Sequence, residues 1–151
     1  MSILVKLREL GLELPPVAQP VGAYVPAVRF GQLIFTSGQL PLSGGSLRYV
    51  GKVGKELTEA EGYQAAGICA LNGLAAAAGV AGGVDNLLRV IKVTGFINCD
   101  AGFSRQANVL NGASDLLGKL FDTDHARSAV GVAELPLNAA LEVEMILAVR
   151  E

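Results

Sequence analysis

The sequence predicts an α/β sandwich, in which a layer of sheet packs against helices. Two long segments carry apolar residues three and four positions apart, which is the spacing of one helix face. Several shorter segments are β-branched or alternate between apolar and polar residues, as strands do. Their order, ββ(β)αβαββ, is that of a sheet-and-helix domain. The 151 residues suit a single domain over 1–151, with 1–20 as a short helical extension.

The strands are predicted from β-branched composition and alternation. Gly31 would form the turn between the first two. A further short strand is expected within a glycine-rich loop. The predicted strands lie at about 22–30, 32–39, 47–50, 86–98, 126–134 and 141–150.

The helices are predicted from their caps and their apolar spacing. Ser2 can cap a short helix that ends before Gly11, and a proline-rich connector follows. Thr58 and Glu61 form a capping box for a helix that runs to about Ala78. Its expected apolar stripe is Tyr63, Gly67, Leu71, Leu74 and Ala78. The second long helix has Phe103, Ala107, Leu110, Ser114, Leu117 and Phe121 on one side.

The last strand has two unlike faces. Its odd positions are all apolar and should pack on the helices: Leu141, Val143, Met145, Leu147 and Val149. The other face begins with Glu142 and Glu144 and continues with Ile146 and Ala148. A carboxylate on a partly apolar sheet face requires a partner or water.

Arg127 opens the preceding strand, and small residues follow on its face. Their size leaves room beside the arginine for the floor of a pocket. The guanidinium fork matches a carboxylate in a bidentate manner. Arg127 therefore binds either a substrate carboxylate or, as a structural ion pair, Glu142 or Glu144, and the spacing leaves both interpretations open.

Two further residues invite a functional interpretation. His125 lies near Asp122 and Asp124, and Ser128 follows, but neighbours on one extended strand make a poor triad because their side chains alternate. We therefore interpret His125 as a strand-edge residue rather than a general base. Tyr24, on the first predicted strand, is a core or interface residue or, alternatively, donates a hydrogen bond to a ligand.

Composition excludes several classes. Hydrophobic residues make up 51% and charged residues 17%, which suggests apolar surface buried between subunits. No apolar run reaches the length of a membrane span, and the N-terminus does not resemble a signal peptide, so we expect a cytoplasmic protein without membrane contact. A net charge of −2 and the absence of a basic cluster argue against nucleic acid. Cys69 and Cys99 are expected to be buried reduced thiols, and no zinc spacing or phosphate loop is found.

Three segments together resemble a known family. "HARSAVGVAELPLNAALEVEMI" resembles the C-terminal signature of the reactive intermediate deaminase family, also called YjgF-like. Upstream, "VGAYVPAV" and "IFTSGQLP" resemble its two opening strands, and "VLNGASDLLGKLF" its second helix. The similarity covers roughly residues 18–150.

The resemblance implies a chorismate-mutase-like fold, with a mixed sheet and two main helices on one face. It also implies a homotrimer with a central barrel and with sites at the subunit clefts. Such proteins hydrolyse enamines and imines, such as 2-aminoacrylate, to 2-keto acids and ammonia without a cofactor or metal. Carried over by motif, Arg127 would bind the substrate carboxylate and Glu142 would position water. The cleft would be lined by Tyr24, Ser37, Gly38 and Asn111.

The chain also departs from the family pattern. Ala129 stands where members often have a cysteine, and His125 stands where they often have a proline. The extra N-terminal helix and the glycine-rich loop indicate a longer branch. Two alternatives stay open: a non-enzymatic trimer that binds small carboxylates, for which Glu142 would be unnecessary, and an endoribonuclease or translation inhibitor, which the acidic balance disfavours.

Overall fold

A five-stranded mixed sheet with helices on one face confirms the predicted sandwich. The structure, a computed structural model, describes residues 1–20 and 22–151. Val21, the first residue of the "VGAYVPAV" motif, lies outside the described residues. The sheet has the order β1 (Ala27–Phe30), β2 (Leu33–Thr36), β7 (Leu141–Val149), β5 (Leu87–Asn98) and β6 (Ala126–Val132). Only β5 and β6 pair in parallel within this sheet, because α3 crosses over between them.

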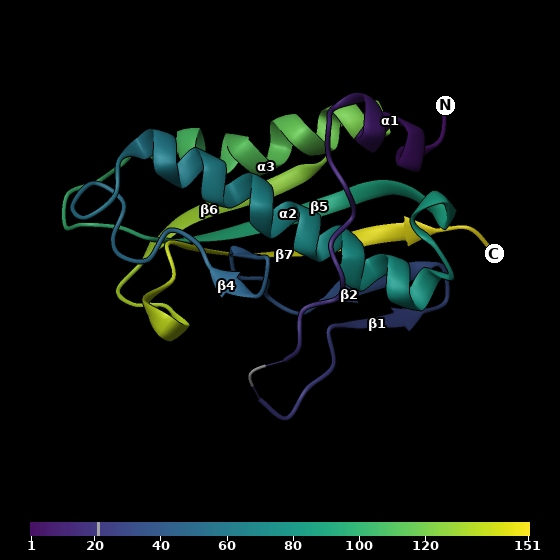
Figure 1. The fold of residues 1–151 in the computed structure, drawn as a ribbon, viewed down its shortest axis with the longest axis horizontal. Coiled ribbons are helices and arrows are strands. Elements are labelled where there is room, and N and C mark those ends of the chain that lie inside the picture. The colour runs from purple at the N-terminus through teal and green to yellow at the C-terminus, as the bar shows by residue number, and fades with distance from the viewer. Residues whose placement is uncertain (21) are drawn as a thin grey trace.

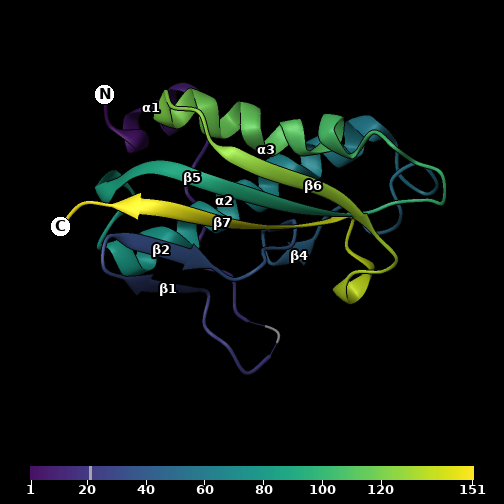
Figure 2. The same ribbon diagram turned by 180° about the vertical axis from the view of Figure 1, so that it is seen from behind.

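The two long helices cover the same face of the sheet. They are α2 (Glu59–Ala81) and α3 (Gln106–Phe121), and both lie in front of the sheet in Figure 1. From behind, the strands face the viewer without a covering helix (Figure 2). The short helix α1 (Ile3–Glu9) lies beside α3, and its Lys6 forms an ion pair with Asp122 just after α3. Short 3-10 turns occur at Val84–Asn86 and Pro136–Asn138.

The predicted caps are present. The Ser2 hydroxyl accepts a hydrogen bond from the amide of Val5 at 3.2 Å. The Thr58 hydroxyl accepts from the amide of Glu61, whose carboxylate accepts from the amide of Thr58 in return. Each cap satisfies an amide that the first helical turn leaves without a carbonyl partner. The capping residues therefore fix where α1 and α2 begin.

Helix α2 buries only part of the predicted stripe. Leu74 and Ala78 are buried as predicted, whereas Tyr63, Gly67 and Leu71 are only half-buried. Along the first half of the helix the buried side is made instead by Gly62, Ala65, Ala66, Cys69, Ala70 and Gly73. Because α2 is apolar on nearly all sides, its spacing does not single out one face. By length and composition α2 also passes as a membrane span, yet 67% of that window is buried inside the fold, as in a core helix.

Several predicted boundaries are wrong near the N-terminus. The first two strands cover only 27–30 and 33–36, so Tyr24 lies in the bend before β1 rather than on a strand. The short strand expected near 47–50 lies earlier, in a hairpin of β3 (Leu42–Ser43) and β4 (Ser46–Leu47) around two glycines of positive φ. Phe103 lies in the turn before α3, and Ala107 on that helix is exposed. Local composition does not reveal which β-prone residues find a neighbouring strand.

The odd face of β7 forms the centre of the core, as predicted. All five of its apolar residues are at most 2% exposed. The helices come close to this layer and to each other because small residues lie between them. A Cβ at Gly112 of α3 would overlap the backbone carbonyl of Tyr63 on α2, and a Cβ at Gly95 of β5 would overlap Leu110.

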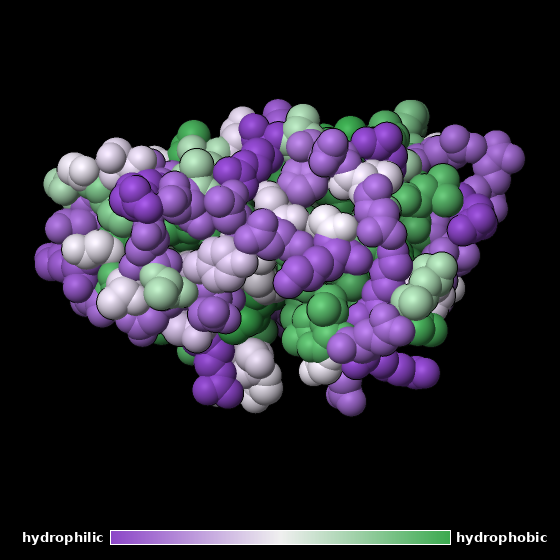
Figure 3. Space-filling model, turned by 90° about the horizontal axis from the view of Figure 1, so that it is seen from above, coloured by the Kyte–Doolittle hydropathy of each residue, from purple (hydrophilic) through white to green (hydrophobic). Residues whose placement is uncertain are grey.

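The other face of the sheet is apolar and uncovered in a single chain. Its exposed residues include Val28, Phe30, Leu33, Phe35 and Val130, of which Phe30 is 80% exposed. Strand register places Phe35 opposite Ile146, and Leu33 opposite Ala148. By contrast, the surface over α1 and α3, seen from above in Figure 3, is largely hydrophilic. Large contiguous apolar surfaces are uncommon on monomers and indicate association.

Replacing Gly112 by alanine should destabilise the fold. The new methyl group would meet the backbone carbonyl of Tyr63, which cannot rotate away, so α2 and α3 must separate. We expect a loss of about 1–3 kcal/mol in the free energy of unfolding, measured by urea denaturation. Gly118→Ala on the same helix is the matched control, since no heavy atom lies within 4 Å of its added Cβ. The control should gain up to about 1 kcal/mol, and equal effects would contradict the packing argument.

Candidate functional site

Four of the predicted site residues line one cavity of about 370 Å³. It lies where β2 ends and β7 begins, beside the bend that precedes β1. Tyr24, Ser37, Gly38 and Glu142 all contribute to its wall. The remaining lining is mostly apolar and comes from Ala18, Gln19, Pro20, Pro26, Gln39, Leu40, Leu42 and Pro136. A mainly apolar concave site with a few converging polar groups is typical of small-molecule binding.

The Glu142 carboxylate packs directly on the backbone of Gly38. A Cβ added at Gly38 would overlap the carboxylate oxygen, so any larger residue would displace it. The neighbouring Ser37 connects the end of β2 to the bend that precedes β1, and both belong to the cavity wall. Its hydroxyl donates to the carbonyl of Val25 at 2.6 Å, and its amide donates to the carbonyl of Pro26 at 2.8 Å. These bonds hold the bend that carries Tyr24 against the end of β2.

The environment of Glu142 favours its protonated form. Partial burial raises the pKa of Glu142, and the nearby negative charge of Glu144 raises it further. Both residues lie on the even face of β7, where the alternation places them. A carboxylate whose pKa moves toward neutrality is better matched to exchanging a proton with water than an ordinary exposed one.

Arg127 and Asn111 lie in a second hollow, on the helix-covered side. This hollow of about 300 Å³ is formed by α3 and the segment leading into β6. Arg127 donates from Nη1 to the Ser114 hydroxyl at 3.0 Å and from Nη2 to the carbonyl of Ala107 at 3.1 Å. Within residues 1–20 and 22–151 it forms no ion pair, so the alternative of a structural pair with Glu142 or Glu144 is not realised there.

The small residues beside Arg127 allow close packing and do not form the open pocket floor that the sequence predicts. A Cβ at Gly131 would come within 2.8 Å of the Cys99 sulfur and 3.0 Å of the Gln106 amide nitrogen. Cys99 is half-buried rather than buried, and Gln106 donates a weak hydrogen bond to its sulfur. Cys69 is buried as predicted, and burial raises the pKa of its thiol. Both thiols are free.

Arg127 and Glu142 lie on opposite faces of the sheet. Arg127 pairs with Val93 of β5, and Val93 pairs with Met145, which places all three on the helix-covered face. Glu142 pairs with Phe96 and therefore faces the other way. With its guanidinium bonded to α3, Arg127 does not reach the cavity of its own chain.

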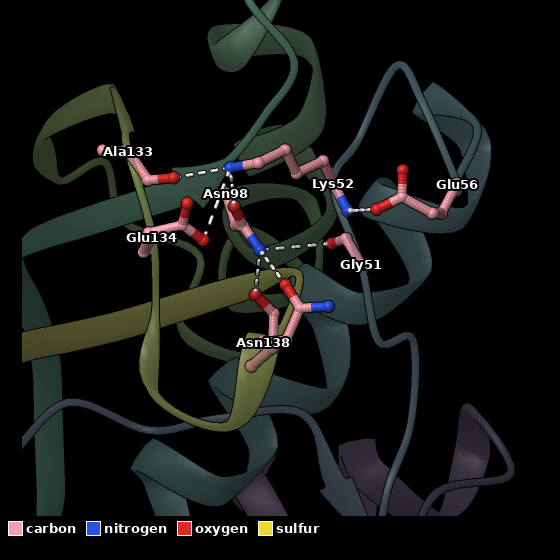
Figure 4. A network of polar contacts seen from close by, with 8 residues as sticks. Gly51, Lys52, Glu56, Asn98, Ala133, Glu134 and Asn138 are labelled. Carbon is pink, nitrogen blue, oxygen red and sulfur yellow. Dashed lines mark hydrogen bonds and ion pairs between the residues drawn. The ribbon is translucent and has the colours of Figure 1, made fainter.

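A polar network not foreseen from the sequence holds the loop that carries Pro136 into the cavity wall (Figure 4). Lys52 donates from its ammonium to Asn98 Oδ1 at 2.8 Å and to the carbonyl of Ala133. The buried Asn98 amide donates to Asn138 Oδ1 and to the carbonyl of Ala139, both at 3.1 Å. The sequence signal for this network is the position of Asn98 at the end of an apolar strand, because a buried side-chain amide requires hydrogen-bond partners.

These contacts stabilise an unusual backbone. Leu137 and Asn138 both adopt positive φ, at 60° and 57°. Two successive residues other than glycine in this region are costly unless the surroundings impose the conformation. The network around Lys52 and Asn98 supplies that support, because it bonds both ends of the loop (Figure 4).

The described residues contain no group of three or more histidine, cysteine, aspartate or glutamate side chains placed to hold a metal ion. The polar side chains that line the cavity include Glu142, Tyr24 and Ser37, and those that line the second hollow include Arg127, His125 and Ser114.

Comparison with known proteins assigns the family. The family model described as "YjgF/chorismate_mutase-like, putative endoribonuclease" matches residues 4–148. "Protein TCP17" of Trypanosoma cruzi is 39% identical over 96% of this chain and 92% of its own. A "2-iminobutanoate/2-iminopropanoate deaminase" of Dermatophagoides farinae is 30% identical over 89% of this chain and 92% of its own.

The solved structures agree on the fold. The crystal structure of a "putative endoribonuclease" from Shewanella oneidensis superposes with a TM-score of 0.95 at 31% identity. It covers 99% of this chain, and this chain covers all of it. The agreement extends over nearly the whole chain, and with the family match it confirms the resemblance carried by the sequence motifs. The chain belongs to the YjgF/chorismate-mutase-like family.

Proposed function

We propose that this protein hydrolyses small imines and enamines of the 2-aminoacrylate type to 2-keto acids and ammonia. One observation carries the proposal: a half-buried carboxylate of raised pKa, Glu142, faces a small cavity that holds no cation among its described lining residues. Among its described lining residues, such a cavity supplies a proton acceptor for water but no positive charge to pair with a substrate carboxylate. A relative of this chain in Dermatophagoides farinae is named as a 2-iminobutanoate/2-iminopropanoate deaminase, which agrees with this chemistry.

We propose further that a neighbouring chain supplies the missing arginine. Arg127 lies on β6, one of the two edge strands of the sheet, on the opposite face from Glu142. The uncovered apolar face around Phe30, Phe35 and Val130 supports association through the sheet. A homotrimer built around these faces would bury them in a central barrel and bring Arg127 of one subunit to the cavity of the next.

The proposed reaction requires little of the protein beyond orientation and one proton acceptor. The imine carbon is already electrophilic, so Arg127 needs only to hold the carboxylate while water approaches. Glu142 accepts a proton from the water as the water oxygen bonds to the imine carbon, and it passes this proton to the nitrogen, which gives a carbinolamine. Glu142 then accepts the hydroxyl proton of the carbinolamine and delivers it to the amine nitrogen. The C–N bond breaks, ammonia leaves, and the oxygen becomes the carbonyl of the keto acid. Tyr24, Ser37 and Gly38 would shape the cavity, with Asn111 beside Arg127.

Ribonuclease activity is the weaker candidate. The family description and the Shewanella oneidensis relative carry the word endoribonuclease. RNA binding, however, relies on an excess of lysine and arginine, whereas this chain has a net charge of −2.

Substitution of the two proposed working residues should impair turnover in different ways. The assay measures keto-acid release from 2-iminopropanoate, generated in situ by an amino-acid oxidase. Glu142→Gln should lower kcat about 10²- to 10⁴-fold, as expected for loss of a general base. Arg127→Ala should lower kcat/KM about 10- to 100-fold, mainly through KM. Failure of the wild type to accelerate release, with keto-acid binding retained, would favour the non-enzymatic binder.

Mixing the two impaired variants should restore activity, measured as kcat/KM, if the site is shared between chains. Co-refolded Arg127→Ala and Glu142→Gln subunits form some clefts in which the arginine of one chain and the glutamate of its neighbour are both native. In an equal mixture this holds for about a quarter of the clefts, so about a quarter of wild-type activity should return. Mixing without unfolding serves as the control. No recovery after verified subunit exchange would place both residues of a working site in one chain.

The pH profile should report the environment of Glu142. Activity requires its deprotonated form, so kcat/KM falls as the pH drops through a pKa that lies above the ordinary carboxyl value. Glu144→Gln removes a neighbouring negative charge, lowers the pKa of Glu142 and should move the acidic limb to lower pH. Glu9→Gln on the exposed side of α1 is the matched control. An unchanged limb in Glu144→Gln would show that another group controls it.

A further inference from the structure

Two side chains beside Arg127 have no assigned role. Ser114 on α3 accepts a hydrogen bond from Nη1 of Arg127 at 3.0 Å. The same hydroxyl lies 2.9 Å from Nε2 of His125, two residues before Arg127 in the sequence. All three residues line the hollow between α3 and the start of β6. The result is a continuous chain from a half-buried imidazole through a hydroxyl to the guanidinium.

The chemistry of arginine fixes one hydrogen bond of this chain, and the tautomer of His125 sets the direction of the other. Arginine has no acceptor, so the Ser114 oxygen accepts from Arg127. The hydroxyl proton of Ser114 is then free to be donated to Nε2 of neutral His125, whose other ring nitrogen carries the ring proton. Burial lowers the pKa of His125 and the charge of Arg127 lowers it further, against a smaller opposing effect of Asp124. The neutral imidazole, which can accept this hydrogen bond at Nε2, is thus the favoured charge state near neutral pH.

The same contacts fix the position of the guanidinium and leave part of it available. Arg127 has five N–H groups, of which one points to Ser114 and one to the carbonyl of Ala107. Both acceptors belong to α3, so the group is held from one side. The Nε–H and one N–H on each Nη are left over by these two bonds. An unrestrained arginine would have to be immobilised when a carboxylate binds, whereas this one is already oriented.

We propose that Ser114 and His125 are positioning residues that orient Arg127 for a substrate carboxylate. Ser114 is the direct support, and His125 fixes the direction of the Ser114 hydroxyl. Neither touches the reacting atoms. The inference rests on the proposed function, because it takes the substrate carboxylate as the ligand of Arg127. It also explains why a histidine stands immediately before the Ala-Arg-Ser segment in this chain.

The test uses two pairs of variants in the full-length protein. Ser114→Ala removes the bridging hydroxyl, and Ser114→Thr keeps it. His125→Leu removes the acceptor, and His125→Gln places an amide oxygen near the position of Nε2. We expect Ser114→Ala and His125→Leu to raise KM for 2-iminopropanoate about 2- to 10-fold with kcat nearly unchanged. The two conservative variants should restore KM. Ser104→Ala, at an exposed position before α3, is the matched control.

Direct binding separates this inference from the proposed function. The dissociation constant for pyruvate, measured by calorimetry on the same variants, should rise with KM and be largest for Arg127→Ala. An active wild type whose KM and pyruvate affinity are unchanged in Ser114→Ala would overturn the inference alone. A wild type without turnover that binds pyruvate through Arg127, and less tightly in Ser114→Ala, would overturn the proposed reaction and support the positioning role. Pyruvate affinity insensitive to Arg127→Ala, without turnover, would overturn both.

Discussion

The two-residue period of β7 is the constraint on which the rest of the structure depends. Its odd residues are buried beneath α2 and α3, so its even residues must face the open side of the sheet. A slip by one residue would bury two carboxylates and expose five apolar side chains, which the core could not tolerate. Glu142 is therefore directed away from the helices, and it reaches the cavity because Gly38 presents no side chain there.

Close helix packing builds the other candidate site. Gly112 lets α3 approach the backbone of α2, and Gly95 lets Leu110 approach the sheet. At this short range, α3 brings the Ser114 hydroxyl and the Ala107 carbonyl to the guanidinium of Arg127. The position of α3 is thus set by packing residues, and the mainly polar residues that line the hollow occupy positions that the helix approach makes available. Two N–H groups of Arg127 are bonded to α3 of its own chain, and these bonds leave its other N–H groups over.

The separation of the two sites and the uncovered sheet face have a common explanation in the proposed assembly. A chain that holds a carboxylate on one face and an arginine on the other cannot use both on one small ligand. The same chain leaves one face of its sheet uncovered by helices, and the apolar side chains on that face are exposed. Association through that face would bury the apolar surface and place complementary groups together. The high apolar content of the sequence is consistent with this arrangement.

Local signals in the sequence determined the element order, the caps at Ser2 and Thr58, and the buried face of β7. The family motifs also identified the residues that line the cavity, since Tyr24, Ser37, Gly38 and Glu142 come from contiguous, alternating segments. The tertiary structure decided what no local pattern contains. The buried side of α2 depends on its neighbours, because the helix is apolar almost all round. The bonds of Asn98 and Lys52 join segments at least 40 residues apart. The placement of Arg127 away from Glu142 follows from β5 lying between their strands. Alternation tells which residues of one strand share a face, but only the strand order and register relate that face to the next strand.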